Sequence, residues 1–182
     1  MRIGLLAAGM SKRMRGSNKL LELLDGKTIL ERSVENALSF TDMVTVITGY
    51  DSERTEMILS RYPVTVMRNP DYEKGQETSL RLLLSNVKED ILVAPADMPF
   101  LTADDFSLAE EKLKGFYSAR PFHDGNAGHP VALSGDFVKL VPDTEKRIRE
   151  LIKELPHCFY EGRAENILDI DTPEILESFR KR

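Results

Sequence analysis

The sequence predicts a three-layer α/β/α sandwich built on a mostly parallel sheet. Short runs of apolar and β-branched residues alternate with stretches in which apolar residues recur at helical spacing. Strands that are apolar throughout are typical of parallel sheets covered by helices on both faces. The 182 residues contain no repeat, low-complexity tract or long linker, so we expect a single domain over residues 1–182.

The expected elements alternate regularly through the first half of the chain. Strands are expected at Ile3–Ala8, Met43–Thr48, Val64–Met67 and Ile91–Ala94, where the residues are apolar or β-branched. Amphipathic helices are expected between them, at Thr28–Ser39, Glu53–Tyr62 and Thr78–Val87.

The second half is less regular and predicts a partly antiparallel region of the sheet. Strands are expected at Phe116–Pro121 and Val131–Leu133, with a turn at His123–Gly128 between them. A helix is expected over Thr144–Leu155, with Thr144 as its N-cap. Two edge strands and a closing helix complete the prediction, at Cys158–Tyr160, Ile167–Ile170 and Pro173–Arg180.

Composition and charge exclude several classes of protein. No apolar run approaches the roughly 20 residues that span a bilayer. The N-terminus also lacks a signal-peptide pattern, so we expect a cytoplasmic protein with no membrane partner. The single cysteine, Cys158, excludes an internal disulfide framework and a cysteine-based metal site. A net charge of −5 argues against nucleic acid as a partner.

The loop after the first strand concentrates positive charge on this acidic chain. Residues 1–21 contain five basic residues and no acid, which suits a small polyanion. Ala7 and Ala8 leave room for a flat ligand and Gly9 allows a sharp turn, while Arg13 and Lys19 add charge beside the backbone N–H groups. The spacing fits neither a P-loop nor the dinucleotide fingerprint. From the residues alone, a solvated basic surface loop remains the alternative.

Carboxylates follow two of the other expected strands. Asp97 ends the strand at 91–94, where it could bind Mg²⁺ together with substrate phosphates. Alternatively, Asp97 caps a helix that starts near Thr102. Asp169 and Asp171 alternate along the last expected strand and so share a face. The alternative there is a polar edge that leads into the final helix.

Two further stretches carry polar groups toward the same edge of the sheet. Thr78 and Ser79 open a helix after Gly75, which offers an anion or base contact or is simply a capped surface helix. His129 stands between Gly128 and Pro130. A lone histidine is more often structural than catalytic, because catalysis needs partners within hydrogen-bond reach. We therefore do not expect His129 to act as a general base.

The stretch "LLAAGMSKRMRGSNKLL" resembles the signature Leu-x-x-Gly-x-Ser/Gly-x-Arg-Met/Phe-Gly-…-Lys of the nucleotidyltransferases. The resemblance is strongest to the molybdenum-cofactor branch, the MocA-like cytidylyltransferases and MobA-like NTP transferases. Residues in register are Leu6, Gly9, Ser11, Arg13, Met14 and Lys19. Two departures stand out. Arg15 replaces a glycine common in the family, and "VPDTEKRIREL" keeps only Asp143 and Arg147 of a Gly-Asp-x-Gly-Ala-Arg pattern.

The resemblance implies a Rossmann-like nucleotidyltransferase fold, that of the nucleotide-diphospho-sugar transferases. It implies transfer of CMP from CTP to a phosphorylated acceptor, molybdopterin or molybdenum cofactor, with release of pyrophosphate. The implied partners are the nucleoside triphosphate, a small phosphorylated acceptor such as a pterin, and a molybdoenzyme or its chaperone. Three alternatives stay open: a guanylyltransferase, a sugar- or polyol-phosphate nucleotidyltransferase, and a nucleotide-binding module without transfer activity.

The resemblance also implies roles for individual residues. Arg13, Lys19 and Asp97 would be catalytic, and Asp97 with Asp171 would bind Mg²⁺. The nucleotide would contact Ala7, Ala8, Gly9, Ser11, Arg13, Lys19, Asn69, Gly75 and Ser79. The acceptor would contact Gly128, His129 and Pro130.

Overall fold

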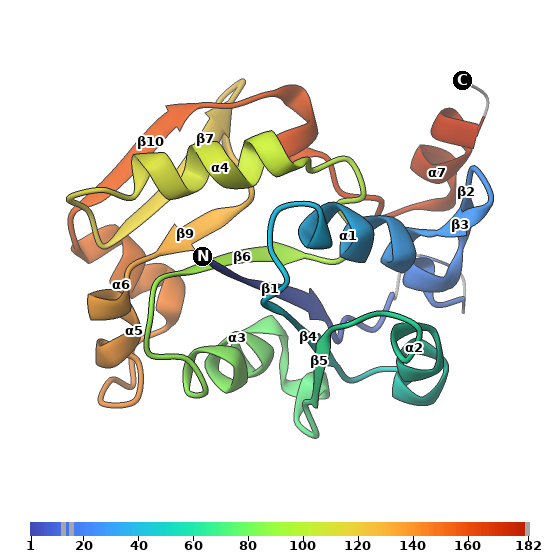
Figure 1. Ribbon diagram of the computed structural model, residues 1–182, viewed down its shortest axis with the longest axis horizontal. Helices are drawn as coiled ribbons and strands as arrows, with labels where there is room; N and C mark the ends of the chain where they lie inside the picture. Colours follow the sequence, from blue (N-terminus) through green and yellow to red (C-terminus); the bar gives the residue numbers. More distant parts are fainter. Residues whose placement is uncertain (12–13, 15–16, 181–182) are drawn as a thin grey trace.

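A computed structural model describes residues 1–11, 14 and 17–180, and it places an eight-stranded mixed sheet between two layers of helices (Figure 1). Across the sheet the strands run in the order β10 (His157–Glu161), β7 (Ser118–His123), β9 (Val131–Leu133), β6 (Ile91–Pro95), β1 (Arg2–Ala7), β4 (Val44–Thr48) and β5 (Thr65–Arg68). Strand β8 (Asn126–Ala127) pairs with β7, and β2 (Leu23–Leu24) and β3 (Lys27–Thr28) form a separate hairpin. The expected α/β sandwich is confirmed.

The central strands are parallel, which brings their carboxyl ends to one edge. β1 pairs in parallel with β4 and β6, and β4 pairs in parallel with β5. β9 runs antiparallel to both β6 and β7, so the expected antiparallel region is also confirmed. Ligands of open α/β sheets bind beyond the carboxyl ends of such strands. The loops that follow β1, β4, β5 and β6 are therefore where a site is expected.

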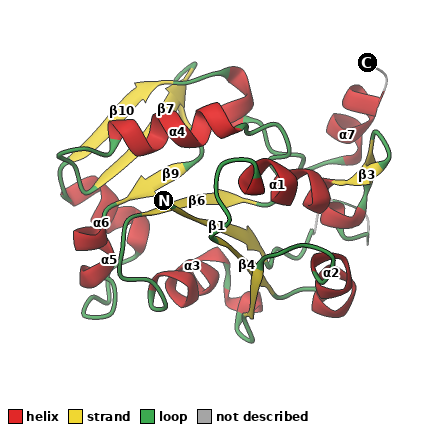
Figure 2. Ribbon diagram, viewed as in Figure 1, coloured by secondary structure: helices red, strands yellow, loops and turns green. Residues whose placement is uncertain are grey.

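Two hydrophobic clusters hold the helices against opposite faces of the sheet. The first cluster joins the sheet to α1 (Ile29–Leu38), α2 (Ser52–Leu59) and α4 (Ala103–Lys112). The second joins it to α3 (Gln76–Leu84), α5 (Gly135–Leu140) and α6 (Ile148–Glu154). Figure 2 shows α1 and α4 on one side of the sheet and α3 on the other. Helix α7 (Pro173–Arg180) lies beside the β2–β3 hairpin. Within the described ranges, no helix is both long and apolar enough to cross a bilayer.

Two helix starts differ from the sequence prediction. Thr144 does not cap a helix, because α6 begins four residues later with Arg147 as its N-cap. The guanidinium of Arg81 donates hydrogen bonds to the backbone carbonyls of Val141, Thr144 and Lys146, which holds this stretch outside a helix. Helix α3 starts at Gln76, two residues before the expected start, with Gly75 as its N-cap. Helix α5 was not predicted.

The expected edge strand at Ile167–Ile170 is wrong. Residues Ala164–Ile167 form a 3₁₀ helix, η3, and the chain then crosses the ends of the central strands. Its backbone makes no ladder with another strand there; instead the N–H of Ile170 donates to the carbonyl oxygen of Asp97 at 3.0 Å. Asp169 and Asp171 therefore flank an anchored residue and do not share the face of a strand.

Candidate functional site

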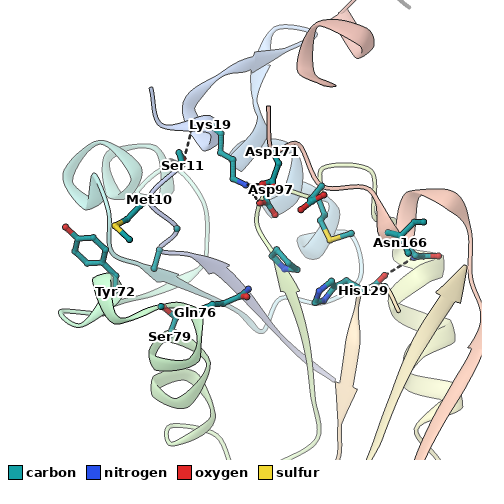
Figure 3. A pocket seen from close by; sticks show the side chains of 18 of the residues that line it. Met10, Ser11, Lys19, Tyr72, Gln76, Ser79, Asp97, His129, Asn166 and Asp171 are labelled. Atoms are coloured by element: carbon teal, nitrogen blue, oxygen red, sulfur yellow. Dashed lines mark hydrogen bonds and ion pairs between the residues drawn. The ribbon is translucent and has the colours of Figure 1, made fainter. Parts of the chain in front are cut away.

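A cavity of about 660 Å³ lies at the carboxyl ends of the central strands. Many residues predicted for the site line this cavity: Ala8, Gly9, Ser11, Lys19, Gly75, Ser79, Asp97, Gly128, His129 and Asp171. In Figure 3, Met10, Ser11 and Tyr72 lie on one side of the cavity, and His129 and Asn166 lie on the other. The structure thus brings together segments that are as far apart in the sequence as residues 8 and 171.

Three of the residues predicted for the site do not line the cavity, and a fourth lies outside the residues that the structure describes. Ala7 is buried within β1, and Pro130 is buried behind His129. Asn69 is also buried, but its side-chain Nδ2 donates to Thr78 Oγ1 and Ser79 Oγ, both at 2.9 Å. Asn69 therefore fixes the first turn of α3 from behind. Arg13 lies outside the residues that the structure describes.

The loop after β1 is closed by a contact between its two ends. The backbone N–H of Lys19 donates to Ser11 Oγ at 3.1 Å. Lys19 begins a short 3₁₀ helix, η1 (Lys19–Leu21), and the side chain of Asn18 caps this helix by accepting from the Leu20 N–H. This local structure directs the Lys19 side chain into the cavity (Figure 3).

Three carboxylates and one ammonium group form the charged centre of the cavity. Asp97, Asp169 and Asp171 each offer an oxygen atom, and these atoms lie within 4.8 Å of one another. The ammonium of Lys19 forms ion pairs with Asp97 Oδ2 and Asp171 Oδ1. Burial alone would lower the pKa of Lys19, but the two carboxylates outweigh it and raise the pKa above its ordinary value of 10.5. Lys19 is therefore charged at neutral pH.

The donor set fits a hard divalent cation such as Mg²⁺. Carboxylate oxygens are the ligands that such ions prefer. Asp97 Oδ1 is buried and has no hydrogen-bond partner among the described residues. Burial raises the pKa of Asp169, and the negative charges of Asp171 and Asp97 raise it further. A second cation beside Lys19 would relieve this repulsion.

The structure decides between the two interpretations of Asp97. Helix α4 is capped by Thr102, whose backbone N–H and hydroxyl both donate to Asp105 Oδ2 at 2.8 Å. The Asp97 side chain pairs with Lys19 instead. Asp97 is thus a cavity residue and not the cap of α4.

His129 stands on the side of the cavity predicted to receive the acceptor. Burial lowers the pKa of its imidazole, and the nearby charge of Arg120 lowers it further, to about 4. Its Nδ1 is buried, and no group in the described part of the chain forms a hydrogen bond with it. An imidazole with so low a pKa is a poor base at neutral pH, in agreement with the expectation that His129 is not a general base.

Sequence reasoning missed several lining residues. Tyr72 lies in a short 3₁₀ helix, η2 (Tyr72–Lys74), Gln76 is the first residue of α3, and Asn166 belongs to η3. Gln76 follows Gly75 at a helix start, a signal that could have indicated its place. Asn166 stands in an irregular stretch without periodicity, so no pattern in the sequence distinguishes it.

The protein has the nucleotide-diphospho-sugar transferase fold, which it shares with solved nucleotidyltransferases. A nucleotidyl transferase from Methanothermobacter superposes with a TM-score of 0.84 at 22% sequence identity, covering 99% of this chain and 95% of that one. Molybdopterin-guanine dinucleotide biosynthesis protein A from Archaeoglobus fulgidus superposes with a TM-score of 0.75 at 20% identity, covering 100% and 97%. These likenesses establish the fold.

The chain belongs to the family described as MobA-like NTP transferase domain, which matches residues 3–158. The molybdenum cofactor cytidylyltransferase of Escherichia coli K12 is 32% identical over 181 residues, covering 97% of this chain and 93% of the relative. The molybdenum cofactor guanylyltransferase of Aliivibrio fischeri MJ11 is 24% identical, covering 96% and 93%. The predicted family is confirmed.

Proposed function

We propose that this protein transfers CMP from CTP to a phosphorylated acceptor of the molybdopterin type and releases pyrophosphate. The observation that carries the proposal is the charged centre of Lys19, Asp97, Asp169 and Asp171, in one cavity with the β1 loop. The identity to the E. coli cytidylyltransferase, over nearly the whole of both chains, supports the choice of nucleotide and acceptor.

In this reaction an oxygen of the acceptor phosphate attacks the α-phosphorus of CTP. The bond from the α-phosphorus to the oxygen that bridges it to the β-phosphorus breaks, and pyrophosphate leaves with that electron pair. A phosphate monoester is mostly ionised at pH 7, since its second pKa is about 6. The attack therefore needs no strong base, which agrees with the low pKa of His129.

The residues of the cavity position the substrates and balance their charge. Gly9, Ser11 and Lys19 line the side of the cavity proposed for the triphosphate, where backbone N–H groups of such a loop would bind phosphate oxygens. Asp97, Asp169 and Asp171 would hold a divalent ion, which when bound would neutralise charge on the phosphate oxygens. Gly128 and His129 border the place proposed for the acceptor. Positioning and charge neutralisation are what phosphoryl-type transfer requires.

A second candidate is transfer of GMP from GTP to the same class of acceptor. It is favoured by the guanylyltransferases among the relatives, which match at 24% to 32% identity. The same cavity, charged centre and chemistry serve both candidates, which differ only in the base that is bound.

The test is pyrophosphate release from CTP or GTP, with Mg²⁺ and a molybdopterin-type acceptor. We expect release with CTP, little with GTP, and none without the acceptor or after chelation of the metal. A clear preference for GTP contradicts the first choice. If the protein binds CTP or GTP but releases pyrophosphate from neither, it is a nucleotide-binding module without transfer activity. Asp97→Asn tests the site itself, and we expect it to lower the rate about 100-fold.

A further inference from the structure

Asn166 is a buried polar residue on the acceptor side of the cavity, only 3% exposed. It binds both backbone groups of His129. The His129 N–H donates to the Asn166 carbonyl oxygen at 2.7 Å, and Asn166 Nδ2 donates to the His129 carbonyl oxygen at 2.9 Å. This pair of hydrogen bonds fixes the position of His129 relative to η3 (Figure 3).

The neighbouring Gly128 shows how closely the two segments approach. A Cβ atom at position 128 would lie 2.3 Å from the Asn166 carbonyl oxygen and 2.8 Å from its carbon. Both are rigid backbone atoms, so a side chain at this position would push the segments apart. The glycine is thus explained by the contact with Asn166.

Asn166 is itself anchored to helix α4 through Asp105, a buried carboxylate that forms an ion pair with the half-exposed Arg163. Its Nδ2 donates to Asp105 Oδ1 at 3.0 Å, and its Oδ1 accepts from the backbone N–H of Arg163 at 2.6 Å. The Arg163 guanidinium binds the same Asp105 carboxylate with both Nε and Nη2, at 3.1 and 2.6 Å. Both side-chain atoms of the amide are therefore satisfied, and their geometry is fixed by groups that do not line the cavity.

A second anchor lies a few residues further along the chain. The Ile170 N–H donates to the carbonyl oxygen of Asp97, and Asp169 and Asp171 flank Ile170. Between this bond and Asn166 only three residues intervene. The place of Asp169 and Asp171 therefore depends on how η3 is held at Asn166.

We propose that Asn166 is a positioning residue that holds the Gly128–His129 turn and the acidic segment Asp169–Asp171 in fixed register to each other. With its neighbours Asp105 and Arg163 it sets the distance between the acceptor's phosphate and the carboxylates that would hold the metal ion. This proposal rests on the proposed function for the identity of the acceptor. Its metal-binding part does not depend on that identity.

The test measures Mn²⁺ binding to Asn166→Ala by electron paramagnetic resonance, with no nucleotide or acceptor present. Outer-shell groups typically contribute 10- to 100-fold to metal affinity, so we expect the Mn²⁺ dissociation constant to rise about tenfold. In the transfer assay we expect the KM for the acceptor to rise by a similar factor, while the KM for CTP changes less than about twofold.

Asn69→Ala is the matched control, because Asn69 is equally buried and holds the opposite side of the cavity. Asn69→Ala is expected to raise the KM for CTP and to leave the Mn²⁺ affinity unchanged. Arg163→Lys is a milder second variant if Asn166→Ala does not fold. The Arg163 side chain is half exposed, and the change removes the two guanidinium hydrogen bonds that hold Asp105, the residue to which Asn166 Nδ2 donates. We expect it to weaken Mn²⁺ binding in the same direction.

Three outcomes overturn the proposal. The wild-type protein binds no Mn²⁺, or folded Asn166→Ala and Arg163→Lys proteins bind Mn²⁺ as tightly as the wild type. The third is that Asn166→Ala and Asn69→Ala change the Mn²⁺ affinity and both KM values equally. The last result would indicate general destabilisation. If wild-type protein binds Mn²⁺ but releases no pyrophosphate, the proposed function fails, and the Mn²⁺ comparison still decides the role of Asn166.

Discussion

The ammonium group of Lys19 lies against the carboxylate of Asp97, and the same ammonium also pairs with Asp171 (Figure 3). Both partners are largely buried, with 12% of the Lys19 side chain and 14% of the Asp97 side chain exposed. A cation supplied by the chain itself therefore offsets part of the negative charge of the three carboxylates. A divalent ion bound at these carboxylates would compete with Lys19 for the same oxygens, and a bound triphosphate would offer Lys19 other anions.

Removing this internal cation should strengthen metal binding in the absence of nucleotide. Two unit charges 4 Å apart interact by about 4 kcal/mol near a protein surface, and we expect roughly a third of this, a tenfold gain in Mn²⁺ affinity, for Lys19→Met. In the transfer assay the same variant should lose about 100-fold in rate, because charge on the triphosphate is no longer balanced. Mn²⁺ titration and pyrophosphate release measure the two effects separately.

Lys27→Met is the control for that prediction. Lys27 also pairs with a carboxylate, Glu35, but its side chain is 52% exposed and lies away from the cavity. Such exposed ion pairs contribute little, so neither Mn²⁺ affinity nor rate should change. Weaker metal binding by Lys19→Met would show that Lys19 organises the carboxylates and does not compete with the ion.

Asp169→Asn should raise the thermal stability of the protein and weaken its binding of a metal ion. Burial and two neighbouring carboxylates raise the pKa of Asp169, so the folded protein binds a proton there more readily than the unfolded chain. Ionised Asp169 therefore lowers stability at neutral pH, and this loss fades as the pH falls below the raised pKa. Asp169 is only partly shielded and keeps contact with solvent, so the repulsion is screened and we expect a gain in Tm of about 2 °C at pH 7.

Two measurements check this prediction. Thermal unfolding of wild type and Asp169→Asn at pH 7 and at pH 4 should show a difference that shrinks at the lower pH. Mn²⁺ affinity at pH 7 should fall about tenfold, as expected for loss of one ligand. A lower Tm together with unchanged Mn²⁺ affinity would contradict both the repulsion and the ligand role.

Much of the frame of the site could be predicted from the sequence. Strand β1 and the strand before Asp97 are short apolar runs, and parallel strands bring their carboxyl ends to one edge. Gly75 precedes helix α3 and Ser79 lies in its first turn, and a glycine followed by hydroxyl residues is a common sequence pattern at a helix start. These features depend on local residue order, which is why the β1 loop and Asp97 were correctly placed at one cavity.

The rest depends on contacts between distant residues. Nothing around Lys19 indicates that its ammonium would pair with Asp97 and Asp171. The start of α6 is displaced because Arg81, far back in the sequence, binds the carbonyl of Thr144. Asn166 is held in position by hydrogen bonds to Asp105 and His129, and the residues around it show no helical or strand periodicity that would have indicated its role.

The buried carboxylate of Asp105 should make stability depend on acid pH. Burial alone would raise its pKa, but Arg163, Thr102 and Asn166 outweigh it and lower the pKa below the ordinary 3.8. The stabilisation is therefore fully present above pH 3.8 and is lost as the pH falls through the lower folded pKa. Asp105→Asn removes a buried charge whose partner Arg163 is half exposed, and it should reduce the free energy of unfolding by about 2 kcal/mol at pH 7.

Urea unfolding at pH 7 and at several values down to pH 2 measures this effect. The gap between wild type and Asp105→Asn should narrow as the pH falls. Glu111→Gln is the control on the same helix, because the Glu111 side chain is 61% exposed and pairs with neighbouring Lys112 at the surface. A constant gap across the pH range would show that the lost stability comes from packing and not from the charge of Asp105.

Gly49→Ala should weaken nucleotide binding and leave metal binding by Asp97, Asp169 and Asp171 unchanged. Gly49 follows β4, and a Cβ atom there would lie 2.6 Å from the Cβ of Tyr72 and 2.8 Å from the Cβ of Ala8. Both neighbours line the cavity on the side proposed for the nucleotide, so one or both must move. Small displacements of positioning groups are costly, and we expect the dissociation constant for CTP to rise about tenfold.

Gly9→Ala is the control for Gly49→Ala, because it also adds a methyl group beside the cavity but at a position where the methyl group meets no described atom. Among the residues that the structure describes, no atom lies within 4 Å of a Cβ built at Gly9, so this variant should fold with unchanged Tm. Mn²⁺ affinity without nucleotide should equal that of the wild type in Gly49→Ala, because Asp97, Asp169 and Asp171 lie on other segments. If Gly49→Ala binds CTP as tightly as the wild type, the wall formed by Ala8 and Tyr72 does not contact the nucleotide. If Mn²⁺ affinity falls as well, Gly49 supports the whole cavity and not one side of it.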